Sequence, residues 1–312
     1  MAHYTVLNDT SIQTILIDYG IEKVTSYKVL SGGSENTNYL VKTKNNSFVL
    51  TICEQKSIKD ATELASLLEY LKLNKFSTSI LIKTITGAFT TVWNDKPVML
   101  KEFIEGTIVE DLPNDLLEYL GKELGKLHQV KAPDYLPVSV NYGIEHFNEV
   151  EIYAPNSSFN SWLKSMENYI KDHISTELPK TIIHSDIFYN NIIVNEDNSY
   201  ATIMDFEEAC YYYRLFDIGM MIVGTCCQKE VINLDKVANL LKGYQQENKL
   251  LESEIKALQA FTVYGAVVTA FWRHQNFNHI NIDVTMKDHY LAMKELADHI
   301  KGVPYKEFYK VK

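Results

Sequence analysis

The stretch "HSDIFYNN", residues 184–191, places a carboxylate and two carboxamides directly after an apolar run. A further apolar run, residues 201–204, ends at Asp205. Phosphoryl transfer needs metal ions that neutralise phosphate charge and a carboxylate near the attacking hydroxyl. An Asp followed five residues later by an Asn can supply that carboxylate and an oxygen ligand of the kind Mg²⁺ prefers. We therefore predict Asp186 as catalytic base, with Asn191 and Asp205 as metal ligands.

A structural alternative exists for each of these three residues, because Asp and Asn also occupy turns and cap helices. Any one of them alone could be such a turn residue. Their order along the chain, with each polar residue at the end of an apolar run, favours chemistry over turn formation.

The composition excludes several classes of protein. The chain has 312 residues and 46% hydrophobic residues, which is enough for a large core and argues against disorder. A net charge of −10 argues against a general nucleic-acid binder, since phosphate backbones require a basic surface. The four cysteines show no metal-binding spacing and are expected to be buried thiols.

The chain shows no targeting or membrane signal. The N-terminal residues lack a basic segment followed by an apolar one, so a secretory signal is not expected. The longest apolar stretch, residues 257–272, is too short and too polar to be expected to span a bilayer. We expect a reducing, cytoplasmic setting.

The pattern of apolar residues predicts two parts. A helix capped by Asn8 is followed by strands within residues 25–54, a helix over 57–73 and a hairpin around Asn94–Asp95. After residues 105–107 the pattern becomes mostly helical, with short strands around the opening motif. The helices are expected at 114–129, 158–174, 213–228, 232–246, 252–273 and 285–300.

The predicted fold class is therefore α+β and bilobal. A small antiparallel β lobe, residues 1–104, would be joined by a hinge near 102–106 to a larger, mainly helical lobe, residues 105–312. A cleft between such lobes is the default ligand site.

The ordered motifs resemble the aminoglycoside phosphotransferase-like kinases, whose fold is protein-kinase-like. His184, Asp186 and Asn191 match that family's H-x-D-x-x-x-x-N loop, "IMDF" matches its metal-binding Asp, and "YRLFDIG" matches a later Asp, here Asp217. The strings "ENTNY", "VLTICE" and "FWRHQNFN" resemble its homoserine kinase branch, which serves threonine biosynthesis.

The resemblance implies ATP and Mg²⁺ as cofactors and a small-molecule hydroxyl as acceptor. The glycine-containing loop with Gly32, Gly33 and Ser34 would cover the phosphates, although two glycines also suit a simple hairpin turn. The hinge would offer adenine the carbonyl of Glu102 and the N–H of Ile104. Thr51 stands where such kinases usually carry a lysine, which leaves Lys42 or Lys56 as the phosphate anchor.

Three further residues of the catalytic half are expected to be structural. His184 is predicted to bond the loop backbone and hold its shape, and Asp217 to bind the backbone of the same loop. His128, at the end of an amphipathic segment, is expected to be a packed core histidine.

The acceptor is less strongly indicated than the chemistry. Arg273 could bind a carboxylate through two parallel hydrogen bonds, and Glu207 or Glu208 an ammonium group, as L-homoserine requires; Arg273 could equally be a helix-pairing residue. Kinases of choline, ethanolamine, methylthioribose or aminoglycosides would share every catalytic residue. A nucleotide-binding pseudokinase and a metal-dependent phosphohydrolase are the alternatives of another class.

Overall fold

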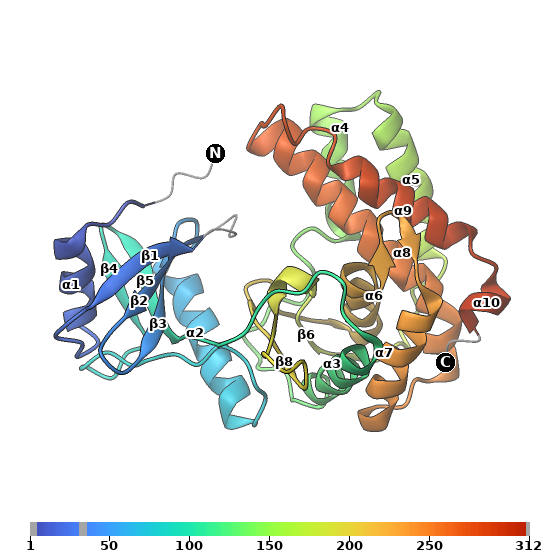
Figure 1. The fold of residues 1–312 in the computed structure, drawn as a ribbon. Helices are drawn as coiled ribbons and strands as arrows, with labels where there is room; N and C mark the ends of the chain where they lie inside the picture. Colours follow the sequence, from blue (N-terminus) through green and yellow to red (C-terminus); the bar gives the residue numbers. More distant parts are fainter. Residues whose placement is uncertain (1–4, 31–35, 310–312) are drawn as a thin grey trace. The chain divides into compact units, whose positions relative to one another are not determined.

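The computed structural model describes residues 5–30 and 36–309, and the chain forms two compact units, residues 1–105 and 106–312 (Figure 1). The two-part α+β architecture predicted from the sequence is confirmed. The assignment of nucleotide binding to the first unit and catalysis to the second stays a prediction.

The first unit is a five-stranded antiparallel sheet with one helix on each face. The strand order is β1-β2-β3-β5-β4. Apolar residues of the sheet, among them Tyr39, Leu50 and Leu100, form a core with α1. The elements are α1 (Asp9–Ile17), β1 (Ser26–Leu30), β2 (Asn36–Lys42), β3 (Ser47–Cys53), α2 (Ile58–Leu73), β4 (Thr90–Trp93) and β5 (Lys96–Glu102).

Local sequence explains the ends of these elements. Asn8 caps α1 by accepting a hydrogen bond from the backbone of Ser11, and Ser57 with Asp60 forms a capping box at α2. The predicted hairpin turn is present, since Asn94 and Asp95 both have positive φ, 48° and 63°, as a two-residue hairpin requires.

The second unit is mainly helical, with three short two-stranded sheets. Its elements are α3 (Asn114–Leu127), η1 (Ile144–Glu149), α4 (Val150–Tyr153), α5 (Ser158–Lys171), β6 (Lys180–Ile183), η2 (Tyr189–Asn191), β7 (Ile192–Val194), β8 (Ala201–Ile203), β9 (Cys210–Tyr213), α6 (Arg214–Thr225), β10 (Cys227–Gln228), β11 (Val231–Ile232), α7 (Leu234–Glu247), α8 (Glu252–Gln275), η3 (Asn276–Ile280), α9 (Tyr290–Gly302) and α10 (Tyr305–Tyr309).

The core of this unit is built around α8. Together with the π-helical turn η3, α8 runs from Glu252 to Ile280, which is long and apolar enough to cross a membrane. The expectation concerned residues 257–272 alone, and the helix that contains them is longer than that stretch. Because 78% of its most apolar window is buried inside the protein, α8 is a core helix, packed against α6 and α9.

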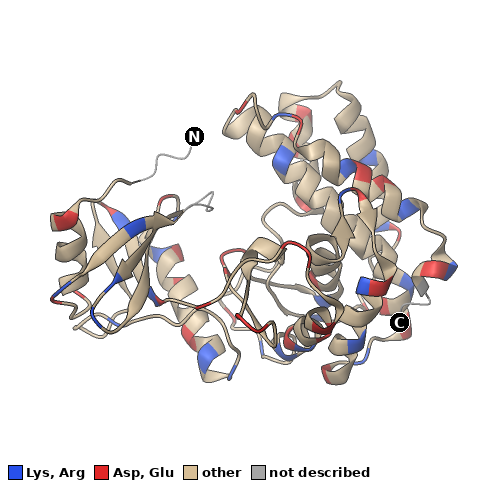
Figure 2. Ribbon diagram, viewed as in Figure 1, with Lys and Arg blue, Asp and Glu red and all other residues tan. Residues whose placement is uncertain are grey.

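Charged residues of both signs are interspersed along the helices (Figure 2). Several form ion pairs one helical turn apart, including Lys59–Glu63 in α2, Lys126–Glu123 in α3 and Lys294–Asp298 in α9. A pair whose two side chains are both exposed, such as Lys59–Glu63, contributes little to stability.

Candidate active site

The β7–β8 hairpin brings two predicted metal ligands to one end of a short sheet. Ile192 pairs with Ile203, and the ladder continues one residue further because the N–H of Met204 donates to the carbonyl of Asn191 at 2.9 Å. Asn191 enters β7 at this end, and Asp205 follows Met204. The hairpin register therefore places Asn191 and Asp205 next to each other.

Asp186 and Asn191 are joined directly. The Nδ2 group of Asn191 donates to the backbone carbonyl of Asp186 at 2.8 Å and to Oδ2 of its carboxylate at 3.1 Å. Asn191 is buried, with 8% exposure, whereas Asp186 is half-buried. A single carboxamide thus holds the loop closed and orients the predicted base.

The oxygen atoms expected to bind a cation are available. No described residue donates a hydrogen bond to Oδ1 of Asn191 or to either carboxylate oxygen of Asp205, which is exposed. Across residues 5–30 and 36–309 no group of three or more His, Cys, Asp or Glu could hold a metal. The pair suits a hard cation that takes its other ligands from phosphate and water.

His184 connects the loop to the strand that carries Asp205. Its Nε2 lies 2.9 Å from the carbonyl of Met204, and its Nδ1 lies 3.2 Å from the N–H of Asp186. Because a carbonyl can only accept, Nε2 carries the hydrogen and Nδ1 accepts. The ring is fully buried. The predicted backbone-bonding role of His184 is confirmed.

Asp217, on α6, binds the start of the same loop. Its two carboxylate oxygens accept the N–H groups of His184 and Ser185, each at 2.8 Å, as predicted. Ser185 has φ of 68° and Asp205 of 70°, which is uncommon for residues other than glycine. Backbone strain of this kind at both ends of the constellation points to a functional constraint.

Tyr142 lies beside the predicted base, although the sequence pattern gave no sign of it. Its hydroxyl donates to the carbonyl of Ser185 at 3.0 Å. Burial, followed by the negative charges of Asp186 and Glu208, raises the pKa of Tyr142 well above its ordinary value, so the phenol stays protonated. Asn141 donates to Oε2 of Glu208 at 2.9 Å and orients that carboxylate on the same side of the loop.

Arg273, near the end of α8, is a half-buried cation close to the predicted base. Burial lowers its pKa, and the negative charge of Asp186 acts in the opposite direction. The one hydrogen bond of its guanidinium within the described chain is a long contact of 3.4 Å to the carbonyl of His289. No carboxylate of a described residue forms an ion pair with it, so most of its donors are not engaged.

The predicted nucleotide residues belong to the first unit. Gly32, Gly33 and Ser34 lie outside the described residues. Glu102 ends β5 and its N–H donates to Ile80, whereas the N–H of Ile104 donates to no described residue. This N–H is therefore available to an acceptor atom such as a ring nitrogen.

A neutral pair of side chains occupies the position on β3 where such kinases usually carry a lysine. Thr51 is buried, lies opposite Asn38 across β2 and β3, and donates to Oδ1 of Asn38 at 2.8 Å. Lys42 is exposed and Lys56 half-buried, and the role of either as the phosphate anchor stays a prediction. Lys96 is bound by Glu54.

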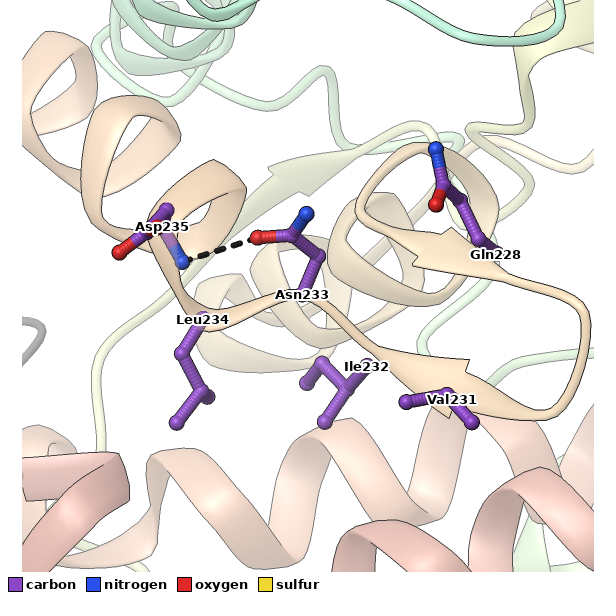
Figure 3. Close-up of a pocket in the computed structure, with 6 residues that line it drawn as sticks. All are labelled: Gln228, Val231, Ile232, Asn233, Leu234 and Asp235. Carbon is purple, nitrogen blue, oxygen red and sulfur yellow. Dashed lines mark hydrogen bonds between the residues drawn. The ribbon is translucent and has the colours of Figure 1, made fainter.

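A cavity of about 390 Å³ elsewhere in the second unit holds none of the predicted site residues (Figure 3). It is lined by the β10–β11 hairpin and the start of α7, including Gln228 and Asn233. Oδ1 of Asn233 already caps α7, and Gln228 donates to Asp111 at 3.0 Å. The side chains of Asn233 and Gln228 are engaged in hydrogen bonds within the protein, so we do not assign the cavity a catalytic role.

Comparison with known proteins agrees with this geometry. Residues 26–252 match the model of the phosphotransferase enzyme family. The homoserine kinase of Agrobacterium fabrum is 26% identical over 266 residues, which cover 83% of this chain and 82% of that protein.

Solved structures share the fold at low sequence identity. A microcompartment-associated aminopropanol kinase superposes with a TM-score of 0.75 at 15% identity, covering 98% of this chain and 100% of that one. A spectinomycin phosphotransferase in complex with ADP and spectinomycin gives 0.72 at 16% identity, covering 97% and 99%. The predicted protein-kinase-like fold is confirmed. The chain belongs to the phosphotransferase enzyme family, as an ATP-dependent enzyme that acts on a hydroxyl group.

Proposed function

We propose that the enzyme transfers the γ-phosphoryl group of ATP, as its Mg²⁺ complex, to the side-chain hydroxyl of L-homoserine, a step of threonine biosynthesis in the cytoplasm. Curated relatives with this activity, 24–26% identical over most of the chain, support the substrate. The loop geometry supports the chemistry. A nucleic acid or a membrane is not expected as a partner.

The proposed mechanism assigns one task to each loop residue. The carboxylate of Asp186 orients the acceptor hydroxyl and takes its proton as the bond to phosphorus forms. Oδ1 of Asn191 and the carboxylate of Asp205 would hold Mg²⁺, which neutralises charge on the phosphates when bound. The loose transition state leaves little covalent chemistry for the protein, so positioning dominates.

The nucleotide would be held mainly by backbone groups. In this proposal the loop with Gly32, Gly33 and Ser34 donates N–H groups to the phosphates. The carbonyl of Glu102 and the N–H of Ile104 bind the adenine edge. The Thr51–Asn38 pair cannot supply the charge of the missing lysine, so the metal would carry more of the phosphate charge.

The environment of the Arg273 guanidinium is the observation that supports an acceptor with a carboxylate. Keeping a guanidinium half-buried without a carboxylate partner is costly, and an anionic ligand would offset that cost. An acceptor with a carboxylate meets this need, because guanidinium binds carboxylate through two parallel hydrogen bonds. Glu208 would receive the ammonium group of the same amino acid. The site thus fits an amino acid with a side-chain hydroxyl.

A substrate panel that measures ADP release tests this proposal. L-Homoserine should have a higher kcat/KM than choline, ethanolamine, methylthioribose or an aminoglycoside. If an acceptor without a carboxylate had a higher kcat/KM than L-homoserine, it would replace homoserine as the proposed substrate. The family assignment would be unchanged. ATP binding, seen as thermal stabilisation, without turnover of any acceptor would favour a pseudokinase.

A further inference from the structure

The imidazole of His128 lies buried where three helices meet. It follows the end of α3, and its Nε2 lies 3.1 Å from Oδ2 of Asp217 on α6. Its Nδ1 lies 2.9 Å from the hydroxyl of Tyr244 on α7. The side chains of His128 and Asp217 have no exposed surface. His128 is a core residue, as expected, but both ring nitrogens make directed contacts that packing alone does not require.

Close packing of α3 against α7 brings Tyr244 to this position (Figure 1). A Cβ atom on Gly121 would lie 2.0 Å from the carbonyl oxygen of Leu240, and one on Gly243 would lie 1.8 Å from that of Glu118. Only glycine permits backbones to approach this closely. The contact between Tyr244 and His128 is thus built into the helix crossing.

The hydrogen bonds from Tyr244 through His128, and those from the catalytic loop, converge on the carboxylate of Asp217. Oδ2 of Asp217 already accepts the N–H of His184, so the hydrogen on the ring of His128 is placed on Nε2. Burial raises the pKa of Tyr244, so its phenol keeps the proton and donates to Nδ1. Tyr244 therefore orients His128, and His128 orients the carboxylate that holds the loop.

Ser185 is the residue on which this carboxylate acts. Its left-handed backbone is held at three atoms: the N–H donates to Asp217 at 2.8 Å, the carbonyl accepts from Tyr142, and the Oγ donates to the carbonyl of Glu208 at 2.7 Å. A conformation of this kind is energetically unfavourable for a residue other than glycine and persists only when its surroundings enforce it. Because Ser185 directly precedes Asp186, its backbone sets where the base points.

We propose that His128 and Tyr244 are positioning residues for Asp186, which neither of them touches. They hold the carboxylate of Asp217 in the one orientation that keeps Ser185 left-handed and aims the base at the acceptor hydroxyl. The inference rests on the proposed role of Asp186 as the base. Displacing a reacting group by about 1 Å can cost on the order of a hundredfold in rate.

Steady-state kinetics of three single variants and one double variant test this inference. His128→Leu removes the donor to Asp217 and should lower kcat about tenfold to a hundredfold, while KM for ATP changes less than about threefold. His128→Gln offers an N–H to Asp217 and an oxygen to Tyr244, and should recover kcat to within about fivefold. Tyr244→Phe should lower kcat in the parent but not in the His128→Leu background, because both act through one contact.

Hydrogen exchange of the backbone amides of His184 and Ser185 gives a readout independent of turnover. Both amides should lose protection in His128→Leu and keep it in His128→Gln. The matched control is Gln259→Leu, which removes a similarly buried polar side chain whose hydrogen bonds to described residues go to the carbonyls of Ile300 and Val303. It should leave these amides and kcat unchanged.

Any of three results would overturn the inference. They are unchanged protection of the two amides in His128→Leu, multiplicative effects of His128→Leu and Tyr244→Phe on kcat, and equal losses of protection and kcat in Gln259→Leu. The assignment of Asp186 as the base is tested separately. It would fail if Asp186→Asn retained parental turnover while the hydrogen-exchange results were as expected.

Discussion

The carboxamide of Asn191 contacts both the backbone carbonyl and the carboxylate of Asp186, at 2.8 and 3.1 Å. Its nitrogen is thereby committed to the base, and its oxygen receives no hydrogen bond from a described residue. One side chain therefore couples the orientation of the predicted base to the predicted metal site. The first two predictions follow from this coupling.

Asp186→Asn should keep ATP binding and lose turnover. The amide is nearly isosteric but cannot accept a proton, and loss of a general base costs on the order of 10²- to 10⁴-fold in kcat. Comparison of kcat with the thermal shift caused by ATP checks this. A loss of only a few-fold would show that Asp186 is not the base.

Asp205→Ala should raise the Mg²⁺ concentration needed for half-maximal activity more than Asn191→Ala does, because Asp205 carries the charge. Asn191→Ala should also lower kcat at saturating Mg²⁺, since the variant releases the carboxylate of Asp186. Titrations of activity with Mg²⁺ separate the two effects. Parental Mg²⁺ dependence in both variants would disprove the metal assignment.

His274 makes the stability of the second unit depend on pH. Burial lowers its pKa from 6.5 to about 4, so the folded state binds a proton less readily than the unfolded chain. The stabilisation is present above pH 6.5 and is lost as the pH falls toward 4. One such group should lower the free energy of unfolding by about 2 kcal/mol between pH 7 and pH 5.

Urea unfolding at several pH values, for the parent and for His274→Gln, measures this loss. The variant should lose this part of the pH dependence while the denaturant m-value stays the same. An identical pH dependence in parent and variant would mean that His274 does not carry the effect.

His289 should report on occupancy of the acceptor site. Burial and then the positive charge of Arg273 lower the pKa of His289. A carboxylate bound to Arg273 neutralises that charge, so saturation with L-homoserine should raise the pKa of His289. Histidine proton NMR titration, with and without ligand, measures the shift. 3-Amino-1-propanol, which is homoserine without the carboxylate, should leave it unchanged.

Local patterns were sufficient to predict most of the fold. The helix over 57–73, which is α2, and the Asn94–Asp95 turn were predicted because helical periodicity and turn-forming residues can be recognised among near neighbours in the sequence. The strand β9 was missed because it is defined by its pairing with β6, about thirty residues earlier. The helix expected from residue 285 begins only at Tyr290, after a turn in which Asp283 accepts from Thr285.

The residues of the candidate site also differ in whether local sequence is sufficient to predict them. Asp186, Asn191 and Asp205 share one short segment, so their order could be recognised in the sequence. The contacts of His128 and Tyr142 join residues far apart in the chain, and helical periodicity does not tell which side chains meet across two elements. Only the packing of the second unit reveals them.

The central claim is that Arg273 selects an acceptor with a carboxylate, and a two-by-two kinetic comparison tests it most directly. The measurement is kcat/KM for L-homoserine and for 3-amino-1-propanol, in the parent and in Arg273→Met. A charge-assisted contact of about 1.5–3 kcal/mol predicts a preference for homoserine of roughly tenfold to a hundredfold in the parent. This preference should disappear in Arg273→Met, with KM for ATP unchanged. Equal use of both acceptors by the parent, or an equal loss for both in the variant, would contradict the account.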